Sequence, residues 1–146
     1  MSLQARQALV DSPNLKTNAI QRADLLDPTK TQTGLIQLLT TICIDKGIIF
    51  QCTAIKSDHH DDSGLGLHCH FNGYCADGWF LKSHTLDDWM DASDPRFQAN
   101  LKECGILDYQ TGLGGSAYTH ADVVAVGRGV FSDGDQDHLH LGALNP

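Results

Sequence analysis

Two clusters of histidine and aspartate, far apart in the chain, constrain the fold more than any other feature of the sequence. The first is HCHFNGYCADGWF, residues 68–80, and the second is DQDHLHLG, residues 135–142. Imidazole and carboxylate groups bind transition metals, and a metal site collects such ligands from distant segments. We therefore expect a fold that brings the two clusters together.

The spacing inside each cluster fits a metal site on a β-sheet. Between His70 and Asp77 stands Gly73, where a tight turn can send the chain back along a strand that carries Asp77. His138 and His140 are two residues apart, so on an extended strand both imidazoles point to one face. Two nitrogens and one carboxylate oxygen can then converge. Three such ligands and a position open to water are typical of catalytic zinc, whereas closed structural sites favour four ligands and many thiolates.

The composition is that of a single globular domain. The chain has 146 residues, of which 41% are hydrophobic and 19% charged, enough to bury about two-thirds of its unfolded surface. We interpret residues 1–146 as one domain, on which residues 1–30 pack as an N-terminal extension of a helical turn or two. No apolar run is long enough to span a bilayer, and the N-terminus lacks a secretory signal, so we expect neither membrane insertion nor signal-directed export.

Charge and cysteine content exclude further classes of function. The formal net charge is −8, and the Lys and Arg residues are scattered, so no basic face is available to bind nucleic acid. The five cysteines include no C-x-x-C pair, and we expect them to be reduced, mostly buried residues. A packing role is expected for Cys69 and Cys75. Cys75 is the alternative fourth metal ligand, because on a strand it shares a face with Asp77.

Hydrophobic patterns predict an α+β fold, with helices on one face of a small, mainly antiparallel sheet and the zinc site at the sheet. One amphipathic helix is expected from Thr31 to a C-cap at Gly47. A second is expected from the N-cap region Ser93-Asp94-Pro95 to Glu103, ended by Gly105. Strands are expected within residues 47–55, 74–81, 106–112, 123–131 and 137–144, the last two as an antiparallel pair.

The remaining histidines have simpler explanations. His59 and His60 stand among aspartates, which favours a solvated loop over a direct role in the site. His84 and His120 are isolated, and we expect them on the surface or in ordinary hydrogen bonds.

The two clusters resemble the motifs of the M15 family of zinc D-alanyl-D-alanine carboxypeptidases and phage endolysin peptidases. HCHFNGYCAD, residues 68–77, is similar to the family motif S-x-H-x-x-G-x-A-x-D, and DHLHLG, residues 137–142, is similar to its terminal H-x-H segment. The resemblance spans about residues 25–142. It implies a hydrolase, a metallopeptidase that uses Zn²⁺ to cut peptide bonds of bacterial peptidoglycan.

The resemblance also implies the roles of particular residues. His70, Asp77 and His140 would be the zinc ligands. The acid/base glutamate of the family corresponds to Asp137 here. His138, on the same strand face as His140, is the second candidate for proton transfer or oxyanion stabilisation.

Binding of the substrate is where the sequence departs from the family. His68 and Tyr74 replace a serine and an arginine of the motif. Members of the family use an upstream arginine to hold the substrate, and Lys56 is the nearest cation here. A lysine cannot form the bidentate contact of an arginine.

Two functional hypotheses follow from the sequence. The first is a phage-encoded zinc peptidase, an endopeptidase or a carboxypeptidase of cell wall degradation, with a peptidoglycan peptide as its partner. It is expected in the host cytoplasm before lysis or in the virion. The alternative is a non-catalytic structural or binding module of the virion, in contact with other virion proteins, that keeps the fold and the metal. The negative charge favours this alternative, because cell walls are anionic.

Overall fold

The computed structural model describes residues 2–59, 70–108, 129–131 and 138–143. Its strands are β1 (Leu15–Lys16), β2 (Phe50–Ala54), β3 (Cys75–Phe80), β4 (Leu107–Asp108), β5 (Gly129–Phe131) and β6 (Leu139–Gly142). Its helices are α1 (Leu3–Val10), α2 (Ala19–Leu26), α3 (Thr33–Thr40), the π-helix η1 (Thr41–Asp45) that continues α3, and α4 (Pro95–Glu103).

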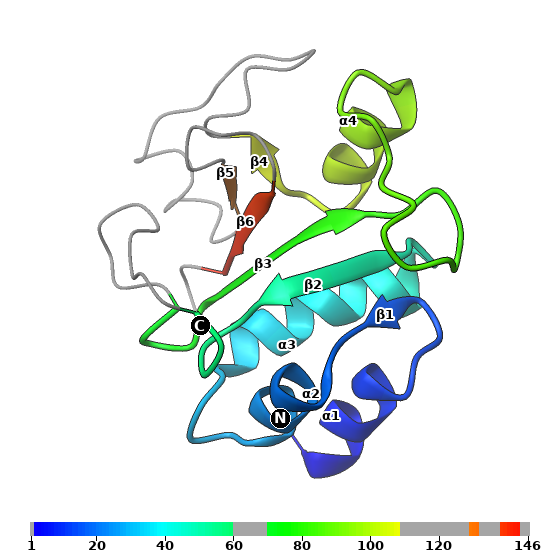
Figure 1. Cartoon of the computed structure of the whole chain (residues 1–146). Coiled ribbons are helices and arrows are strands. Elements are labelled where there is room, and N and C mark those ends of the chain that lie inside the picture. Colours follow the sequence, from blue (N-terminus) through cyan, green and yellow to red (C-terminus); the bar gives the residue numbers. More distant parts are fainter. Residues whose placement is uncertain (1, 60–69, 109–128, 132–137, 144–146) are drawn as a thin grey trace.

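These strands form one mixed sheet in the order β1-β2-β3-β6-β5-β4 (Figure 1). The central neighbours β2, β3, β6 and β5 pair antiparallel, and the parallel pairs β1–β2 and β4–β5 lie at the two edges. Helices α1, α2 and α3 gather beside β1 and β2, whereas α4 lies near the C-terminal end of β3 (Figure 1). The α+β class and the mainly antiparallel sheet are therefore confirmed.

Local sequence signals place both long helices. Helix α3 and its continuation η1 bury one hydrophobic side and end before Gly47, which has a φ of +65°. Helix α4 begins after Asp94, whose side chain accepts a hydrogen bond from the Arg96 amide at 3.0 Å. Gly105, with a φ of +67°, follows its end. These positions agree with the expected helices, because caps and periodicity are encoded locally.

The N-terminal residues contribute more to the fold than the sequence indicates. They form two helices, α1 and α2, and add β1 to the edge of the sheet, where Leu15 pairs with Phe50 of β2. Leu9 and Leu25 are fully buried in the main hydrophobic core. The prediction that residues 1–30 form only a helical turn or two is therefore wrong, because they form two helices and a strand. A strand of two residues is too short to show the alternation by which strands are recognised.

A buried arginine joins α1 to the segment that follows α2. The Arg6 guanidinium donates to the Leu25 carbonyl, the Thr31 hydroxyl and the Thr31 carbonyl, each at 2.8 Å. The Thr31 hydroxyl in turn donates to the carbonyl of Asp24 at 2.7 Å. Hydrogen bonds to a buried charge are stronger than neutral ones. This network therefore fixes the connection from α2 into α3.

Aromatic side chains join α4 to β3. The ring of Phe97 lies 5.1 Å from that of Trp79 and 5.2 Å from that of Phe80, measured between centroids.

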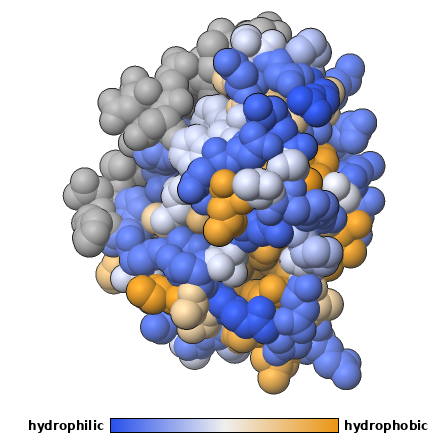
Figure 2. Space-filling model, turned by 45° about the vertical axis from the view of Figure 1, so that its right-hand side comes forward, coloured by the Kyte–Doolittle hydropathy of each residue, from blue (hydrophilic) through white to orange (hydrophobic). Residues whose placement is uncertain are grey.

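Polar residues cover most of the face drawn in Figure 2, and hydrophobic residues form small separate patches on it. Within the described residues, the structure contains no helix of the length and apolarity that crossing a membrane requires.

Replacing Arg6 with methionine should lower the free energy of unfolding by about 2–4 kcal/mol, because buried carbonyls would lose charged hydrogen bonds. Arg22 provides the control, since its ion pair with Asp11 joins side chains that are 41% and 56% exposed. Arg22→Met should cost at most about 1 kcal/mol. Urea unfolding followed by tryptophan fluorescence measures both values. Equal losses would contradict a structural role for the buried network.

Candidate metal centre

The pairing of β3 with β6 brings the two histidine and aspartate clusters together. In this antiparallel pair, Asp77 stands directly opposite His140. Residues opposite each other in a ladder project from the same face of the sheet. As a result, Nδ1 of His140 lies 2.7 Å from Oδ1 of Asp77.

His70 reaches the same place from the turn that precedes β3. The Gly73 amide donates to the His70 carbonyl at 3.0 Å, which closes the turn. Gly73 has a φ of +78°, and a Cβ atom there would collide with the carbonyl oxygen of Lys30. The Gly73 carbonyl accepts a hydrogen bond from the Gln32 amide at 2.9 Å. Glycine is required here because the turn lies directly against the segment between α2 and α3.

Three donor atoms form a compact triangle at this point. Nε2 of His70 lies 3.0 Å from Oδ1 of Asp77 and 3.2 Å from Nδ1 of His140. Ligands 2.0–2.1 Å from a tetrahedral metal would be about 3.3 Å apart, so the triangle has nearly the required size. The three residues are only 1%, 4% and 2% exposed, respectively. This buried group can hold a metal ion, and its donors are two nitrogens and one oxygen.

A backbone carbonyl fixes the orientation of the His70 ring. Nδ1 of His70 lies 2.5 Å from the carbonyl oxygen of Ile55, in the loop after β2. A carbonyl only accepts hydrogen bonds, so Nδ1 carries the proton. In the neutral ring, Nε2 then carries the lone pair that binds a metal, whereas in the protonated ring it donates to Asp77. Metal-binding histidines are oriented in this way by the hydrogen bond at their other nitrogen.

Helix α2 holds the loop that supplies this carbonyl. The Asp24 carboxylate accepts hydrogen bonds from the hydroxyl and the amide of Ser57, at 2.6 and 2.8 Å. Asp58 accepts from the Ile55 amide at 3.0 Å and from the side-chain amide of Gln21 at 2.9 Å. Helix α2 therefore positions Ser57 and Asp58, and Asp58 in turn holds Ile55.

Asp77 is held in its charged form. Burial alone would raise the pKa of Asp77, but hydrogen bonds with His140 and His70 outweigh burial and hold the pKa well below its ordinary value. A carboxylate is the form that binds metals. Because the folded pKa is depressed, this stabilisation is present above the unfolded pKa of about 4 and is lost as the pH falls toward the folded value.

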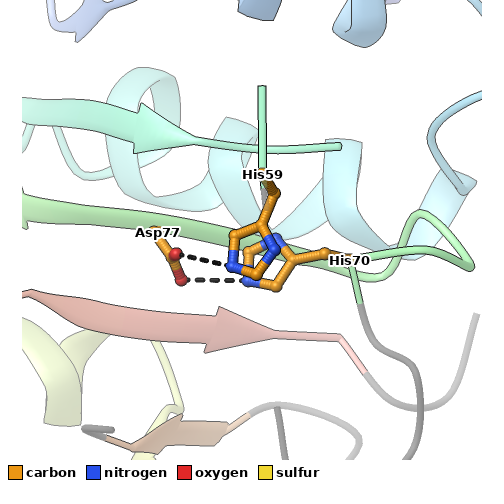
Figure 3. A group of neighbouring side chains, drawn as sticks. All are labelled: His59, His70 and Asp77. Atoms are coloured by element: carbon orange, nitrogen blue, oxygen red, sulfur yellow. Dashed lines mark hydrogen bonds and ion pairs between the residues drawn. The ribbon is translucent and has the colours of Figure 1, made fainter. Parts of the chain in front are cut away.

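His59 belongs to the centre, so the expectation that it lies in a solvated loop is wrong. Its ring is stacked on that of His70, with centroids 3.7 Å apart and an interplanar angle of 10° (Figure 3). Its Nε2 lies 3.3 Å from Oδ2 of Asp77, and its side chain is 12% exposed. The preceding Asp58 bonds to the backbone and to α2 instead of solvating the loop. His60 lies outside the described residues.

His138 lies at the rim of the centre. Its Nε2 is 3.4 Å from Nε2 of His140 and 3.7 Å from Oδ2 of Asp77. The two-residue spacing thus places both imidazoles at one site, as expected. Strand β6 begins at Leu139, and Asp137 lies outside the described residues.

Lys56 and His84 bond to residues outside the triangle of His70, Asp77 and His140. The Lys56 ammonium donates to the Phe71 carbonyl at 2.7 Å and lies 5.4 Å from the centroid of the Phe71 ring. It therefore supports the turn that carries His70. His84 makes an ordinary hydrogen bond, 2.9 Å from Nε2 to the side-chain oxygen of Asn14, as expected. His68 and His120 lie outside the described residues.

Cys75 is disulfide-bonded, so the expectation that every cysteine is reduced is wrong. Its sulfur is consequently not available as a fourth ligand. Cys43, Cys52 and Cys104 are buried and form no disulfide bond, and burial raises the pKa of the Cys43 thiol to about 12. Cys69 lies outside the described residues. Sequence spacing does not reveal a disulfide, because bond formation depends on the separation of the two cysteines in the fold.

No family model, no curated protein and no solved structure matches the chain. The geometry of the centre is therefore the main basis for a functional assignment.

Replacing Gly73 with alanine should weaken metal binding, because the collision with Lys30 would displace the turn that carries His70. Gly47→Ala is the matched control. Gly47 also has a positive φ, but a Cβ atom there would meet nothing within 4 Å. Both variants should lose about 1–2 kcal/mol of stability or more, and only Gly73→Ala should lose metal affinity. Calorimetric zinc titration measures the affinity, and equal affinities in the two variants would contradict the role of the turn.

Proposed function

We propose that the protein is a zinc peptidase of the M15 type that hydrolyses peptide bonds of bacterial peptidoglycan. The group of His70, Asp77 and His140 carries this assignment, since its three donor atoms lie within 3.2 Å of one another. Two histidines and one carboxylate, with a position left for water, form a donor set of catalytic zinc. The same three residues are the ligands that the resemblance of the two sequence motifs implies.

The donor set and the motifs together favour zinc over other metals. Calcium and magnesium prefer oxygen ligands, whereas this group offers two imidazole nitrogens. Iron(II) also binds two histidines and a carboxylate in oxygenases. The similarity of residues 68–77 and 137–142 to the motifs of zinc peptidases favours zinc over iron.

Each residue of the centre has a distinct role in this function. A bound zinc ion would act as a Lewis acid and lower the pKa of a coordinated water to about 7. Asp77 supplies the negative charge, and the bond from His70 to Ile55 keeps one ring nitrogen directed at the metal position. We assign proton transfer to the leaving amine to Asp137 or His138. His138 lies beside the ligand His140 and is 19% exposed, which leaves it accessible to a substrate.

We further propose that the protein is phage-encoded, as an endolysin or a virion-associated enzyme. Peptidoglycan lies outside the reducing cytosol. The disulfide bond of Cys75 agrees with a protein that works there, because disulfides persist in oxidising surroundings. The alternative, a virion module without catalysis, differs from the enzyme only in its lack of hydrolysis.

Purified protein should contain zinc, and His70→Ala or His140→Ala should remove it, because two ligands bind zinc far more weakly than three. His84→Ala is the control, since His84 bonds to Asn14 instead of the centre. Elemental analysis after gel filtration measures the metal content. Full zinc occupancy in both ligand variants would mean that the ligands are wrongly assigned, and iron in place of zinc would argue against a peptidase.

Asp137→Asn should keep zinc but lower muropeptide release from cell walls by about 10²-fold or more, while His138→Ala does less. The reverse order would assign proton transfer to His138. If neither change affects an active preparation, the proposed acid/base chemistry is wrong. A wild-type protein that holds zinc and releases no muropeptides would support the virion module.

A further inference from the structure

Only one carboxylate oxygen of Asp77 belongs to the triangle of donor atoms. That oxygen, Oδ1, lies 3.0 Å from Nε2 of His70 and 2.7 Å from Nδ1 of His140. The other oxygen, Oδ2, lies 3.3 Å from Nε2 of His59, with Nε2 of His138 farther away at 3.7 Å. Asp77 is only 4% exposed, so Oδ2 depends mainly on protein groups for its polar contacts.

The backbone and the ring of His59 are both held in place. The His59 amide donates to the Lys56 carbonyl at 3.2 Å. The His59 ring stacks on that of His70, with centroids 3.7 Å apart and an interplanar angle of 10° (Figure 3). A ring that is fixed on one face presents its Nε2 to Asp77 at a defined position.

The stacking indicates that His59 and His70 do not bind the same metal ion. An imidazole nitrogen binds a metal through a lone pair that lies in the plane of its ring. Because the two rings are nearly parallel and lie one over the other, an ion in the plane of the His70 ring lies outside the plane of the His59 ring. The contact with Oδ2 of Asp77 is the one that His59 can keep while a metal is bound.

We propose that His59 is a positioning residue, which holds Oδ2 of Asp77 so that Asp77 binds the metal through Oδ1 alone. This role rests on the proposed function, in that a zinc ion occupies the triangle of donor atoms. A carboxylate only accepts hydrogen bonds, so the His59 nitrogen that faces it carries the proton. Carboxylates that bind metals are commonly held by a hydrogen bond of this kind.

The contact with His59 keeps a metal position open. Three protein ligands and one water complete a four-coordinate zinc site. Without the contact, Oδ2 of Asp77 could turn to the metal and become a further ligand. It would then compete with the substrate carbonyl for the metal and weaken the effect of the metal on the bound water. His59 therefore acts on the chemistry through Asp77, without touching the reacting atoms.

The test uses two variants that separate the two contacts of His59. His59→Phe keeps a ring that can stack on His70 but has no N–H group. It should lose about 10–100-fold in zinc affinity, and its cobalt-loaded form should show the weaker visible absorption of a higher coordination number. His59→Gln has no ring but carries an amide N–H near the position of Nε2, so it should recover the wild-type cobalt spectrum and most of the zinc affinity.

His84→Phe is the matched control, because His84 bonds to Asn14 outside the centre. Its zinc affinity and cobalt spectrum should be those of the wild type. Circular dichroism checks that each variant is folded. If His59→Phe does not fold, His59→Leu, which also lacks the N–H group, takes its place in the comparison.

Several outcomes would overturn the role of His59. An unchanged zinc affinity and cobalt spectrum in His59→Phe would reject it. Equal changes in His59→Phe and His59→Gln would assign the effect to the ring instead of the N–H group. Loss of all metal from both variants in a folded state would make His59 a ligand.

Muropeptide release separates this role from the proposed function. If zinc-loaded wild type releases no muropeptides while the two His59 variants differ as expected, the positioning role holds and the peptidase is rejected. If the wild type releases muropeptides and His59→Phe keeps the wild-type zinc affinity and cobalt spectrum, the peptidase holds and the positioning role is rejected.

Discussion

The centre depends on the register between β3 and β6. Asp77 meets His140 because the two are opposite each other in the ladder, and the neighbouring pairs are Ala76 with Leu141 and Gly78 with Leu139. Leu139 and Leu141 are fully buried, so a slip of one residue would exchange them with His140 and move hydrophobic side chains out of the core. The same packing that stabilises the sheet thus holds two of the three donors of the triangle in place.

The third donor, His70, depends on residues far from it in the sequence. Helix α2 holds the loop 55–59 through Asp24 and Gln21, and the Ile55 carbonyl of this loop orients the His70 ring. The Arg6 network fixes the segment after α2, against which the turn at residues 70–73 packs. The N-terminal helices therefore serve the centre indirectly, by holding the two loops from which His59 and His70 extend.

Asp77 is the chemical focus of the centre. It is a buried carboxylate with histidine nitrogens on both of its oxygens. Burying so many metal-binding groups together is costly, and a bound cation would offset that cost. Metal binding would then stabilise the folded chain as well as equip it for chemistry, because the donors converge only in the folded state.

The sequence by itself determined the helices near residues 33–45 and 95–103, the main strands and the two clusters of histidine and aspartate, whereas the choice of His70, Asp77 and His140 as ligand candidates came from the resemblance of their motifs. Caps, periodicity and the spacing of histidines are local properties, so they can be read along the chain. Only the tertiary structure decided the edge strand β1, the place of His59 and the disulfide of Cys75. These depend on partners distant in the chain. Asp58 bonds to Gln21 of α2, and the neighbouring His59 stacks on His70. No local sequence pattern encodes the stacking of His59 on His70.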